Sequence, residues 1–289
     1  MKVSVVIASG AGGAFLHRCL ASLKEQAAAR GAEVIVVDRV GASIEPWVRV
    51  ISARGEPRAS VPEMRRRGAL AAKNEIVAVI EEHCTAPPGW IEAIESSFPL
   101  NALAIGGPIL DADFDRVRDW VVYFSEYHNY LPPWPEGDRY LLNGANIAYR
   151  RSALLAHEKE LATGYWEVVL HPRLAEEGRL VSVPAMGARH TGPFDYGYYL
   201  SQRYLLSRVW GGTQRTKASL AKRLVYLVAA PVFPFLLIAR IAARVLANGK
   251  LTGRFLVALP LLVPVAIAYV WGEWLGYLVG PGDALERVE

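Results

Sequence analysis

The sequence MRRRGALAAKNEIVAVIEEHCTAPPGW, which spans residues 64–90, contains the most informative strand of the chain. Its run Ile76–Ile80 is continuously apolar, which is typical of a strand buried on both faces of a sheet. Glu81–His83 follow this run directly, and Pro87–Gly89 then precede a new helical pattern. Acidic side chains at the end of a buried strand are costly unless they bind a cation or a ligand. The stretch therefore predicts a binding site at this strand end, with an exposed acidic turn as the alternative.

Two earlier segments extend this pattern. Val3–Ala8 is an apolar run followed by a glycine-rich turn and a helical pattern, and Glu33–Asp38, with the sequence EVIVVD, is a second strand. Strands that alternate with helices predict an α/β sheet, whose binding sites lie at the C-terminal ends of the strands.

The first 38 residues also contain part of a dinucleotide-binding pattern. Gly10 and Gly12 follow a strand, and Asp38 ends the next one. The third glycine of the pattern should stand near position 15, where the chain has Phe15, and Ala8 and Ser9 stand between Ile7 and Gly10. A Rossmann-type NAD(P)-dependent oxidoreductase is therefore only the third hypothesis for this chain.

The composition separates a globular domain from a basic belt. Of the 289 residues, 52% are hydrophobic and 21% are charged, which excludes a disordered chain and a disulfide scaffold. Residues 1–214 carry 23 basic and 24 acidic side chains, whereas residues 215–254 carry 8 basic and no acidic ones. Because the net charge of +4 belongs to this belt, we expect a membrane and no nucleic acid as a partner. Two cysteines and an N-terminal apolar run too short for a signal peptide fit a cytosolic domain.

The C-terminal part contains two uncharged apolar runs, Leu224–Ala239 and Phe255–Gly272, and the second continues to Gly280 with Glu273 as its only charge. A spanning helix needs about 20 apolar residues. We therefore predict a domain over residues 1–214, followed in 215–289 by the basic belt and two membrane segments, at about 224–246 and 255–279. A pair of buried core helices is the alternative.

The basic belt also predicts the orientation. Its eight side chains prefer the cytoplasmic side of a membrane, which places the main domain in the cytosol at the inner membrane. Two topologies remain open, a two-span hairpin and an interfacial first segment followed by one span. The members of the belt are Arg215, Lys217, Lys222, Arg223, Arg240, Arg244, Lys250 and Arg254.

Taken together over residues 2–210, these segments resemble family 2 glycosyltransferases of the GT-A fold. The resemblance is carried, in order, by VSVVIASGAGGAFLHRCLASLKEQ (3–26), EVIVVD (33–38), residues 64–90, LLNGANIAYRRSAL (141–154) and YWEVVLHPRLAEEGRLVSVPAMGARH (165–190). It implies a Rossmann-like mixed sheet with flanking helices, to which this chain adds C-terminal membrane helices. The implied reaction is the inverting transfer of a sugar from a nucleotide-diphosphate donor to a hydroxyl of a lipid, a lipid-linked glycan or an envelope glycan.

The resemblance also implies roles for particular residues. Glu167 would be the catalytic base, and a divalent metal, Mn²⁺ or Mg²⁺, would be held by Glu81, His83 and His190. The expected donor and diphosphate contacts are Ala8, Asp38, Arg65, Glu81 and Glu82. The expected acceptor-side residues are Asn143, Gly144, Asn146 and Trp166.

Each of these residues also has an ordinary structural interpretation. Glu167 is alternatively a surface glutamate, Arg65 part of a solvated helix face, and Asn143-Gly144 a tight turn. A lone histidine such as His190 is usually structural. The family's Asp-x-Asp motif is replaced here by Glu81–His83, and its Glu-Asp pair by Trp166-Glu167. These departures motivate a second hypothesis, a catalytically degenerate member that serves as a membrane-bound binding or scaffolding subunit.

Overall fold

The computed structural model describes residues 1–289 except positions 43, 56–57, 112–113, 163, 193–194 and 289. The chain forms two compact units, Met1–Ala112 with Pro132–Thr191, and Asp113–Leu131 with Gly192–Glu289. The sequence predicts a division at residue 214. The structural division differs because the long helix before that residue packs with the C-terminal helices, and because residues 113–131 join the same unit.

The first unit is built on a mixed sheet. In the part of the chain that the structure describes, eight strands follow the order β3-β2-β1-β4-β9-β6-β10-β8. Strand β9 runs antiparallel to both β4 and β6, and β8 runs antiparallel to β10, whereas the other pairs are parallel. The expected mixed α/β sheet is therefore confirmed. The strands are β1 (Val3–Ser9), β2 (Glu33–Asp38), β3 (Arg49–Ser52), β4 (Ile76–Ile80), β6 (Ala102–Gly106), β8 (Gly137–Arg139), β9 (Asn146–Arg150) and β10 (Arg179–Ser182).

A small second sheet lies beyond the end of β4. It has the order β5 (Cys84–Thr85), β11 (Ala188–His190) and β7 (Ile109–Leu110). The register pairs His190 with Cys84, and the backbone N–H and hydroxyl of Thr191 both donate to the carbonyl of His83, at 2.8 and 2.6 Å. This sheet therefore holds His190 beside the segment that follows β4.

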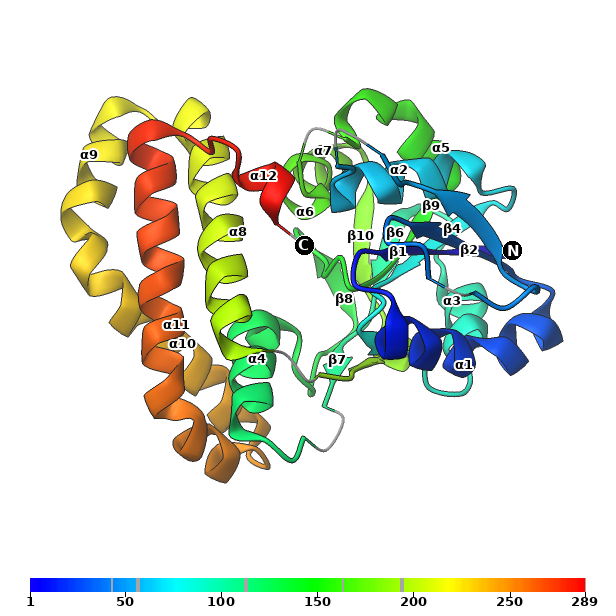
Figure 1. The fold of residues 1–289 in the computed structure, drawn as a ribbon, viewed down its shortest axis with the longest axis horizontal. Helices are drawn as coiled ribbons and strands as arrows, with labels where there is room; N and C mark the ends of the chain where they lie inside the picture. The colour runs from blue at the N-terminus through cyan, green and yellow to red at the C-terminus, as the bar shows by residue number, and fades with distance from the viewer. Residues whose placement is uncertain (43, 56–57, 112–113, 163, 193–194, 289) are drawn as a thin grey trace. The chain divides into compact units, whose positions relative to one another are not determined.

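Helices cover both faces of the large sheet. In Figure 1, α2 and α5 lie on one side of it, and α1 and α3 lie on the other. Helix α2 approaches the sheet closely at Gly68, where a Cβ atom would lie 2.3 Å from Val6 Cγ1. The helices of this unit are α1 (Gly13–Arg30), α2 (Val61–Ala71), α3 (Trp90–Ser97), α5 (Arg151–Ala156), α6 (Trp166–Val169) and α7 (His171–Glu177).

The second unit is helical. Its long helices α8 and α11 pack with their backbones in close contact, since a Cβ atom at Gly272 would lie 2.2 Å from the Tyr204 carbonyl oxygen, and one at Gly276 would lie 2.4 Å from that of Arg208. Small residues permit this approach, as in membrane helix pairs. The helices are α4 (Val117–Tyr127), α8 (Tyr196–Lys217), α9 (Leu220–Ala229), α10 (Phe233–Asn248), α11 (Thr252–Val279) and α12 (Ala284–Arg287).

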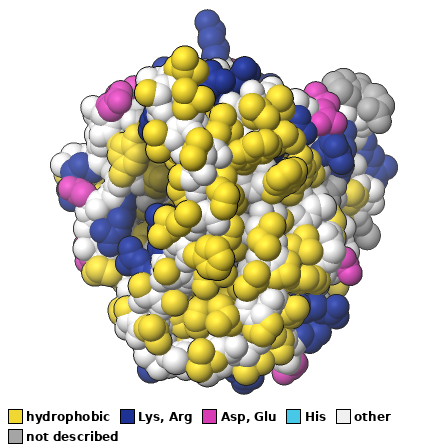
Figure 2. Space-filling view, turned by 90° about the vertical axis from the view of Figure 1, so that its left-hand side faces the viewer, with side chains coloured by type: hydrophobic (Ala, Val, Ile, Leu, Met, Phe, Trp, Pro, Cys, Tyr) yellow, Lys and Arg dark blue, Asp and Glu magenta, His cyan; other side chains and the backbone are white. Residues whose placement is uncertain are grey.

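Two segments of this unit are long and apolar enough to cross a membrane, Leu220–Asn248 and Thr252–Val279, judged by length and composition alone. They include the expected segments 224–246 and 255–279. Large apolar side chains point outward along the first segment, with Val228 80% and Phe235 73% exposed. Figure 2 views the molecule from the left-hand side of Figure 1 and shows hydrophobic side chains across the middle of that face, with Lys and Arg mostly toward its margins. The expected C-terminal apolar helices are therefore present.

Candidate functional site

The centre of the candidate site is the buried guanidinium of Arg65 on α2, which lies between two carboxylates. Arg65 Nη2 is 3.2 Å from Glu81 Oε1, just after β4, and Nη1 is 3.6 Å from Glu167 Oε1 on α6. The Arg65 side chain is only 2% exposed. Burial alone would lower the pKa of Arg65, but the charges of Glu167 and Glu81 outweigh it and raise that pKa. Segments far apart in sequence thus meet around one cation.

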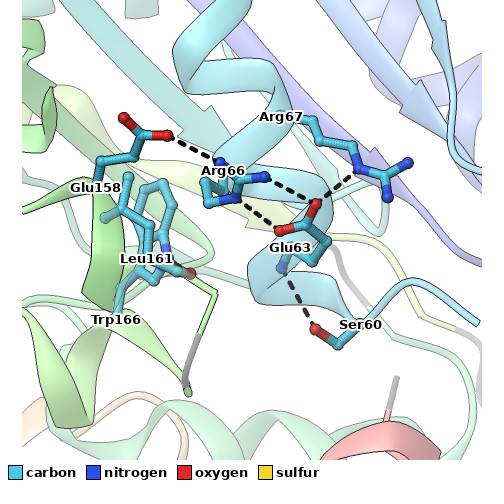
Figure 3. Close-up of polar contacts among 7 residues, drawn as sticks. All are labelled: Ser60, Glu63, Arg66, Arg67, Glu158, Leu161 and Trp166. Atoms are coloured by element: carbon cyan, nitrogen blue, oxygen red, sulfur yellow. Dashed lines mark hydrogen bonds and ion pairs between the residues drawn. The ribbon is translucent and has the colours of Figure 1, made fainter.

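The neighbouring arginines on α2 behave differently. Figure 3 shows that Glu63 binds both Arg66 and Arg67, with Nε–Oε distances of 2.7 and 2.8 Å, and that Arg66 also reaches Glu158 at 3.1 Å. Ser60 begins the helix by accepting a hydrogen bond from the Glu63 backbone N–H, also drawn in Figure 3. The solvated-face alternative therefore describes two members of the arginine run. Arg65 is the exception, because it lies three residues before Gly68 on the face that packs against the sheet.

Glu167 is held in a confined position. Its side chain is 26% exposed, yet its Oε2 atom is buried and has no hydrogen-bond partner among the described residues. Its other oxygen lies over the backbone of Gly144, where a Cβ atom would come within 1.6 Å of Oε1. The adjacent Trp166 is buried and donates from Nε1 to the Leu161 carbonyl at 2.7 Å (Figure 3). Gly144 and Trp166 therefore fix the place of Glu167 from two sides.

Sequence reasoning missed two buried groups next to Glu167. The Tyr149 hydroxyl on β9 lies 2.7 Å from His171 Nε2 at the start of α7, and the backbone N–H of Leu142 donates to His171 Nδ1 at 3.3 Å. Burial lowers the pKa of His171 to about 4, a shift that the Glu167 charge opposes and the Arg65 charge reinforces. The only signal in the sequence was their position inside two segments that carry the family resemblance.

Glu82 has all of its carboxylate engaged by the loop between β1 and α1. Oε1 accepts from the backbone N–H groups of Gly10 and Ala11, at 2.9 and 2.7 Å, and Oε2 accepts from Gly12 N–H and the Ser9 hydroxyl, at 2.9 and 3.0 Å. In a dinucleotide-binding fold, amides at this place bind the pyrophosphate. Here a side chain of the same protein occupies them, which argues against the oxidoreductase hypothesis.

Asp38 organises the next loop in the same way. Its buried carboxylate accepts from the backbone N–H groups of Val40, Gly41 and Ala42, at 3.2, 2.7 and 3.0 Å. Ala8 pairs with Val37 in the parallel register of β1 and β2, one residue before Asp38. Ala8, Asp38 and Glu82 therefore lie at one edge of the sheet, with both carboxylates hydrogen-bonded to backbone.

The expected acceptor-side segment forms a tight turn. The Asn143 side chain accepts from Ala145 N–H at 2.7 Å, which is an Asx turn. Asn146 is fully buried, and its amide accepts from Trp90 Nε1 at 2.9 Å and donates to the Met186 carbonyl at 2.5 Å and to the Pro108 carbonyl. Asn143 and Asn146 thus use these side-chain groups within the protein, whereas Gly144 faces Glu167.

The three expected metal ligands do not form one cluster. Among the described residues, no group of three His, Cys, Asp or Glu side chains is placed to hold a metal ion. Glu81 is paired instead with the guanidinium of Arg65. Burial, reinforced by the nearby His83, lowers the pKa of His190 to about 3, which leaves a neutral imidazole. The cysteines Cys19 and Cys84 are both buried and form no disulfide bond.

No protein-family model matches this chain, and no curated protein is similar to it in sequence. Among solved structures, it is similar to the mannosyltransferase PcManGT from Pyrobaculum calidifontis in complex with GDP-Man and Mn²⁺. The TM-score is 0.54 at 15% identity, over 96% of this chain and 87% of that one. Two further matches have TM-scores of 0.46. They are S. aureus TarS 1-349, at 13% identity over 97% of this chain and 92% of that one, and glucosyl-3-phosphoglycerate synthase from Mycobacterium tuberculosis, at 15% identity over 74% and 78%. The chain therefore has a GT-A-type glycosyltransferase fold, as the sequence led us to expect.

Proposed function

We propose that this protein is a membrane-anchored, inverting glycosyltransferase of family 2. It moves a sugar from a nucleotide-diphosphate donor to a hydroxyl of a lipid, a lipid-linked glycan or an envelope glycan. The observation that carries this proposal is the Arg65 cluster, in which one buried cation binds Glu81 at a strand end and Glu167 on α6. Sugar transfer needs a carboxylate that accepts the acceptor proton and positive charge for the leaving diphosphate, and this cluster holds a confined carboxylate beside a buried cation.

The proposed chemistry assigns Glu167 as general base. As the acceptor hydroxyl attacks the anomeric carbon, its proton passes to Glu167, the new C–O bond forms, and the bond to the diphosphate breaks. The anomeric configuration inverts because attack and departure occur on opposite faces in one step. The leaving diphosphate develops negative charge, which a preorganised cation stabilises. We assign this role to Arg65, whose guanidinium pairs with Glu81 just after β4, on the proposed donor side, and with Glu167.

A divalent metal fits the available donor atoms only in part. The carboxylate of Glu81 and the imidazoles of His83 and His190 suit Mn²⁺ better than Mg²⁺, which prefers oxygen ligands. Because the described residues do not gather three such groups, a bound ion would take its remaining ligands from diphosphate oxygens. When bound, the metal would supply positive charge to the leaving group.

The helical unit supports the membrane part of the proposal. The segments Leu220–Asn248 and Thr252–Val279 have the length and composition of spans, and large apolar side chains of the first are exposed. Five of the eight basic residues of the belt lie within these two segments, and residues 215–254 contain no acidic side chain. Anionic lipid on the cytoplasmic leaflet attracts such a belt, so we propose that the catalytic unit faces the cytosol at the inner membrane.

Donor binding is tested with the purified full chain in detergent. Thermal unfolding is measured with UDP-, GDP- and dTDP-sugars and with NAD(P)H, each with and without Mn²⁺. We expect stabilisation by one class of nucleotide sugar. Stabilisation by NAD(P)H alone would support the oxidoreductase instead, and the absence of any nucleotide-sugar response would refute the glycosyltransferase.

Turnover is tested with Glu167→Gln, and with Glu176→Gln as the matched control because Glu176 is exposed on α7. We expect the first change to lower kcat by about 10²–10⁴-fold, with nucleotide-sugar binding retained, and the second to leave it unchanged. Full turnover by folded Glu167→Gln would remove Glu167 as base. Binding without turnover in the unaltered protein, across lipid and glycan acceptors, would favour the scaffolding hypothesis.

Membrane attachment is tested by expressing the full chain. We expect the full chain to stay in the membrane fraction after alkaline carbonate extraction. In inside-out vesicles, added protease should digest residues 1–191, whereas in right-side-out vesicles it should not. Release of the full chain by carbonate would contradict a spanning anchor.

A further inference from the structure

Two ionisable groups in the core of the first unit have no part in the chemistry proposed above. Tyr149 on β9 and His171 at the start of α7 are both fully buried, and their side chains meet at 2.7 Å between Oη and Nε2. The ring of Tyr149 also packs edge-on against Trp166, the residue before Glu167, with 5.5 Å between ring centroids. The pair therefore packs against Trp166 of α6, the helix that carries the proposed base.

The direction of the hydrogen bonds in this pair follows from the backbone. The N–H of Leu142 can only donate, so His171 Nδ1, its acceptor at 3.3 Å, carries no proton. Burial lowers the pKa of His171 to about 4, and the imidazole is neutral at neutral pH. Its single proton is then on Nε2, which donates to the Tyr149 oxygen. The phenol proton of Tyr149 must therefore point to a different acceptor.

The surrounding charged and titratable groups narrow the choice of acceptor. The charges of Arg65 on α2 and Glu167 on α6 act directly on Tyr149. Arg65 in turn interacts with Glu81 and Tyr165. Arg65 has no acceptor atom. Glu81 is already paired with Arg65 at 3.2 Å. Glu167 Oε2 is buried without a hydrogen-bond partner among the described residues, and such an atom is costly unless it is satisfied.

We propose that Tyr149 and His171 are positioning residues for Glu167: the Tyr149 hydroxyl, oriented by His171, donates a hydrogen bond to Glu167 Oε2. This inference rests on the proposed function of Glu167 as base. Arg65 then holds one carboxylate oxygen and Tyr149 the other, so the carboxylate cannot rotate away from the acceptor hydroxyl. The two atoms are not hydrogen-bonded in this structure; we place the bond in the substrate complex, because catalytic hydrogen bonds are commonly long or poorly aligned before substrate binds.

The pair fixes Glu167 and does not conduct protons. A relay from Glu167 through Tyr149 would have to leave His171 by Nδ1, and that nitrogen is occupied by the Leu142 backbone N–H. The chain of hydrogen bonds thus ends at a donor that cannot accept. Its function is to hold the carboxylate in place for proton abstraction.

The test compares Tyr149→Phe with Tyr140→Phe in the full chain, using the nucleotide sugar found in the donor panel. Phenylalanine keeps the ring that packs on Trp166, and Tyr140 is a matched control because its side chain is exposed. We expect Tyr149→Phe to lower kcat by about 10- to 100-fold, the usual effect of losing a hydrogen bond to a charged group. The KM for the donor should change less than twofold. An unchanged kcat would refute the proposal.

A double-mutant cycle separates positioning from a general structural effect. In the Glu167→Gln background, Tyr149→Phe should cause no further loss, because it acts only through that carboxylate. A further tenfold loss would overturn the positioning role. If Glu167→Gln alone keeps full turnover, the proposed function of Glu167 as base is refuted. If Glu167→Gln abolishes turnover and Tyr149→Phe does not lower it, only the positioning role of Tyr149 is refuted.

A spectroscopic measurement tests the orientation without activity. In protein with ¹⁵N-labelled histidine, assigned by comparison with His171→Gln, the His171 resonances at pH 7 should show a proton on Nε2 and none on Nδ1. A proton on Nδ1 would refute the proposed hydrogen-bond direction even in a protein that catalyses nothing.

Discussion

Replacing Glu82 by Gln should open the loop between β1 and α1. The buried carboxylate accepts four hydrogen bonds, two on each oxygen, from Ser9 Oγ and the backbone N–H groups of Gly10, Ala11 and Gly12. Glutamine keeps the size of the side chain but has one acceptor oxygen and one NH₂ donor. The substitution therefore changes the hydrogen bonding of the loop and leaves the packing volume nearly constant.

The size of the effect follows from these contacts. If the amide oxygen takes the place of Oε1, the bonds from Gly10 and Ala11 survive but lose their charge, which costs roughly 0.5–1 kcal/mol each. The NH₂ group then faces Gly12 N–H, a second donor, and a buried unsatisfied N–H costs roughly 1–3 kcal/mol. The Ser9 hydroxyl can rotate to accept. We expect a local destabilisation of about 2–5 kcal/mol.

Amide hydrogen exchange of the full chain, read by mass spectrometry, measures this opening directly. A local cost of about 2–5 kcal/mol corresponds to exchange at residues 10–12 that is roughly 30- to 4,000-fold faster. Glu25→Gln is the control, because Glu25 is exposed on α1 and its replacement should change stability by less than about 0.5 kcal/mol. If exchange in Glu82→Gln matches that of the control, the carboxylate does not hold the loop, and the reasoning is wrong.

Three further outcomes are expected. Gly144→Ala places a Cβ atom 1.6 Å from Glu167 Oε1 and should lower kcat by about 100-fold with donor binding kept, as a steady-state assay would show. Gly276→Leu should destabilise the helical unit by about 1–3 kcal/mol, because its Cβ atom would lie 2.4 Å from a carbonyl oxygen of α8. Gly253→Leu is the control, because a Cβ atom there meets nothing within 4 Å. Thermal unfolding in detergent compares the two variants. Burial lowers the pKa of His171 from 6.5 to about 4 in the folded protein, so the unfolded chain takes up the proton first as the pH falls. The free energy of unfolding should therefore be constant above pH 6.5 and lower by about 2 kcal/mol at pH 5. In urea unfolding, His171→Gln should flatten this pH dependence.

The regular elements of the first unit were predictable because their signals are local. Continuous apolar runs mark β1, β2 and β4, since strands buried on both faces contain no polar alternation. Their C-terminal ends carry Asp38 and Glu81–Glu82, and the structure places these residues at one edge of the sheet. The basic belt and the two apolar C-terminal segments were likewise readable from composition.

The division into units was not readable in this way. The sequence suggested a boundary at residue 214, where the basic belt begins, but α8 belongs with the C-terminal helices. The reason is its close packing on α11, where Gly272 and Gly276 contact backbone of α8 that lies 68 residues earlier in the chain. Their G-x-x-x-G spacing is typical of a close helix contact, but it does not identify α8 as the partner helix.

The sequence by itself determined which apolar runs form β1, β2 and β4, and at which strand ends carboxylates gather. It also determined the basic, apolar character of the C-terminal part. Only the tertiary structure decided which partner each of those side chains has. Glu81 and Glu82 are neighbours in sequence, yet one pairs with Arg65 and the other binds the β1–α1 loop. Arg65 is buried, while Arg66 and Arg67 bind Glu63. The physical reason is that each partner comes from a distant segment, so the role of a charged side chain is set by what folding brings against it.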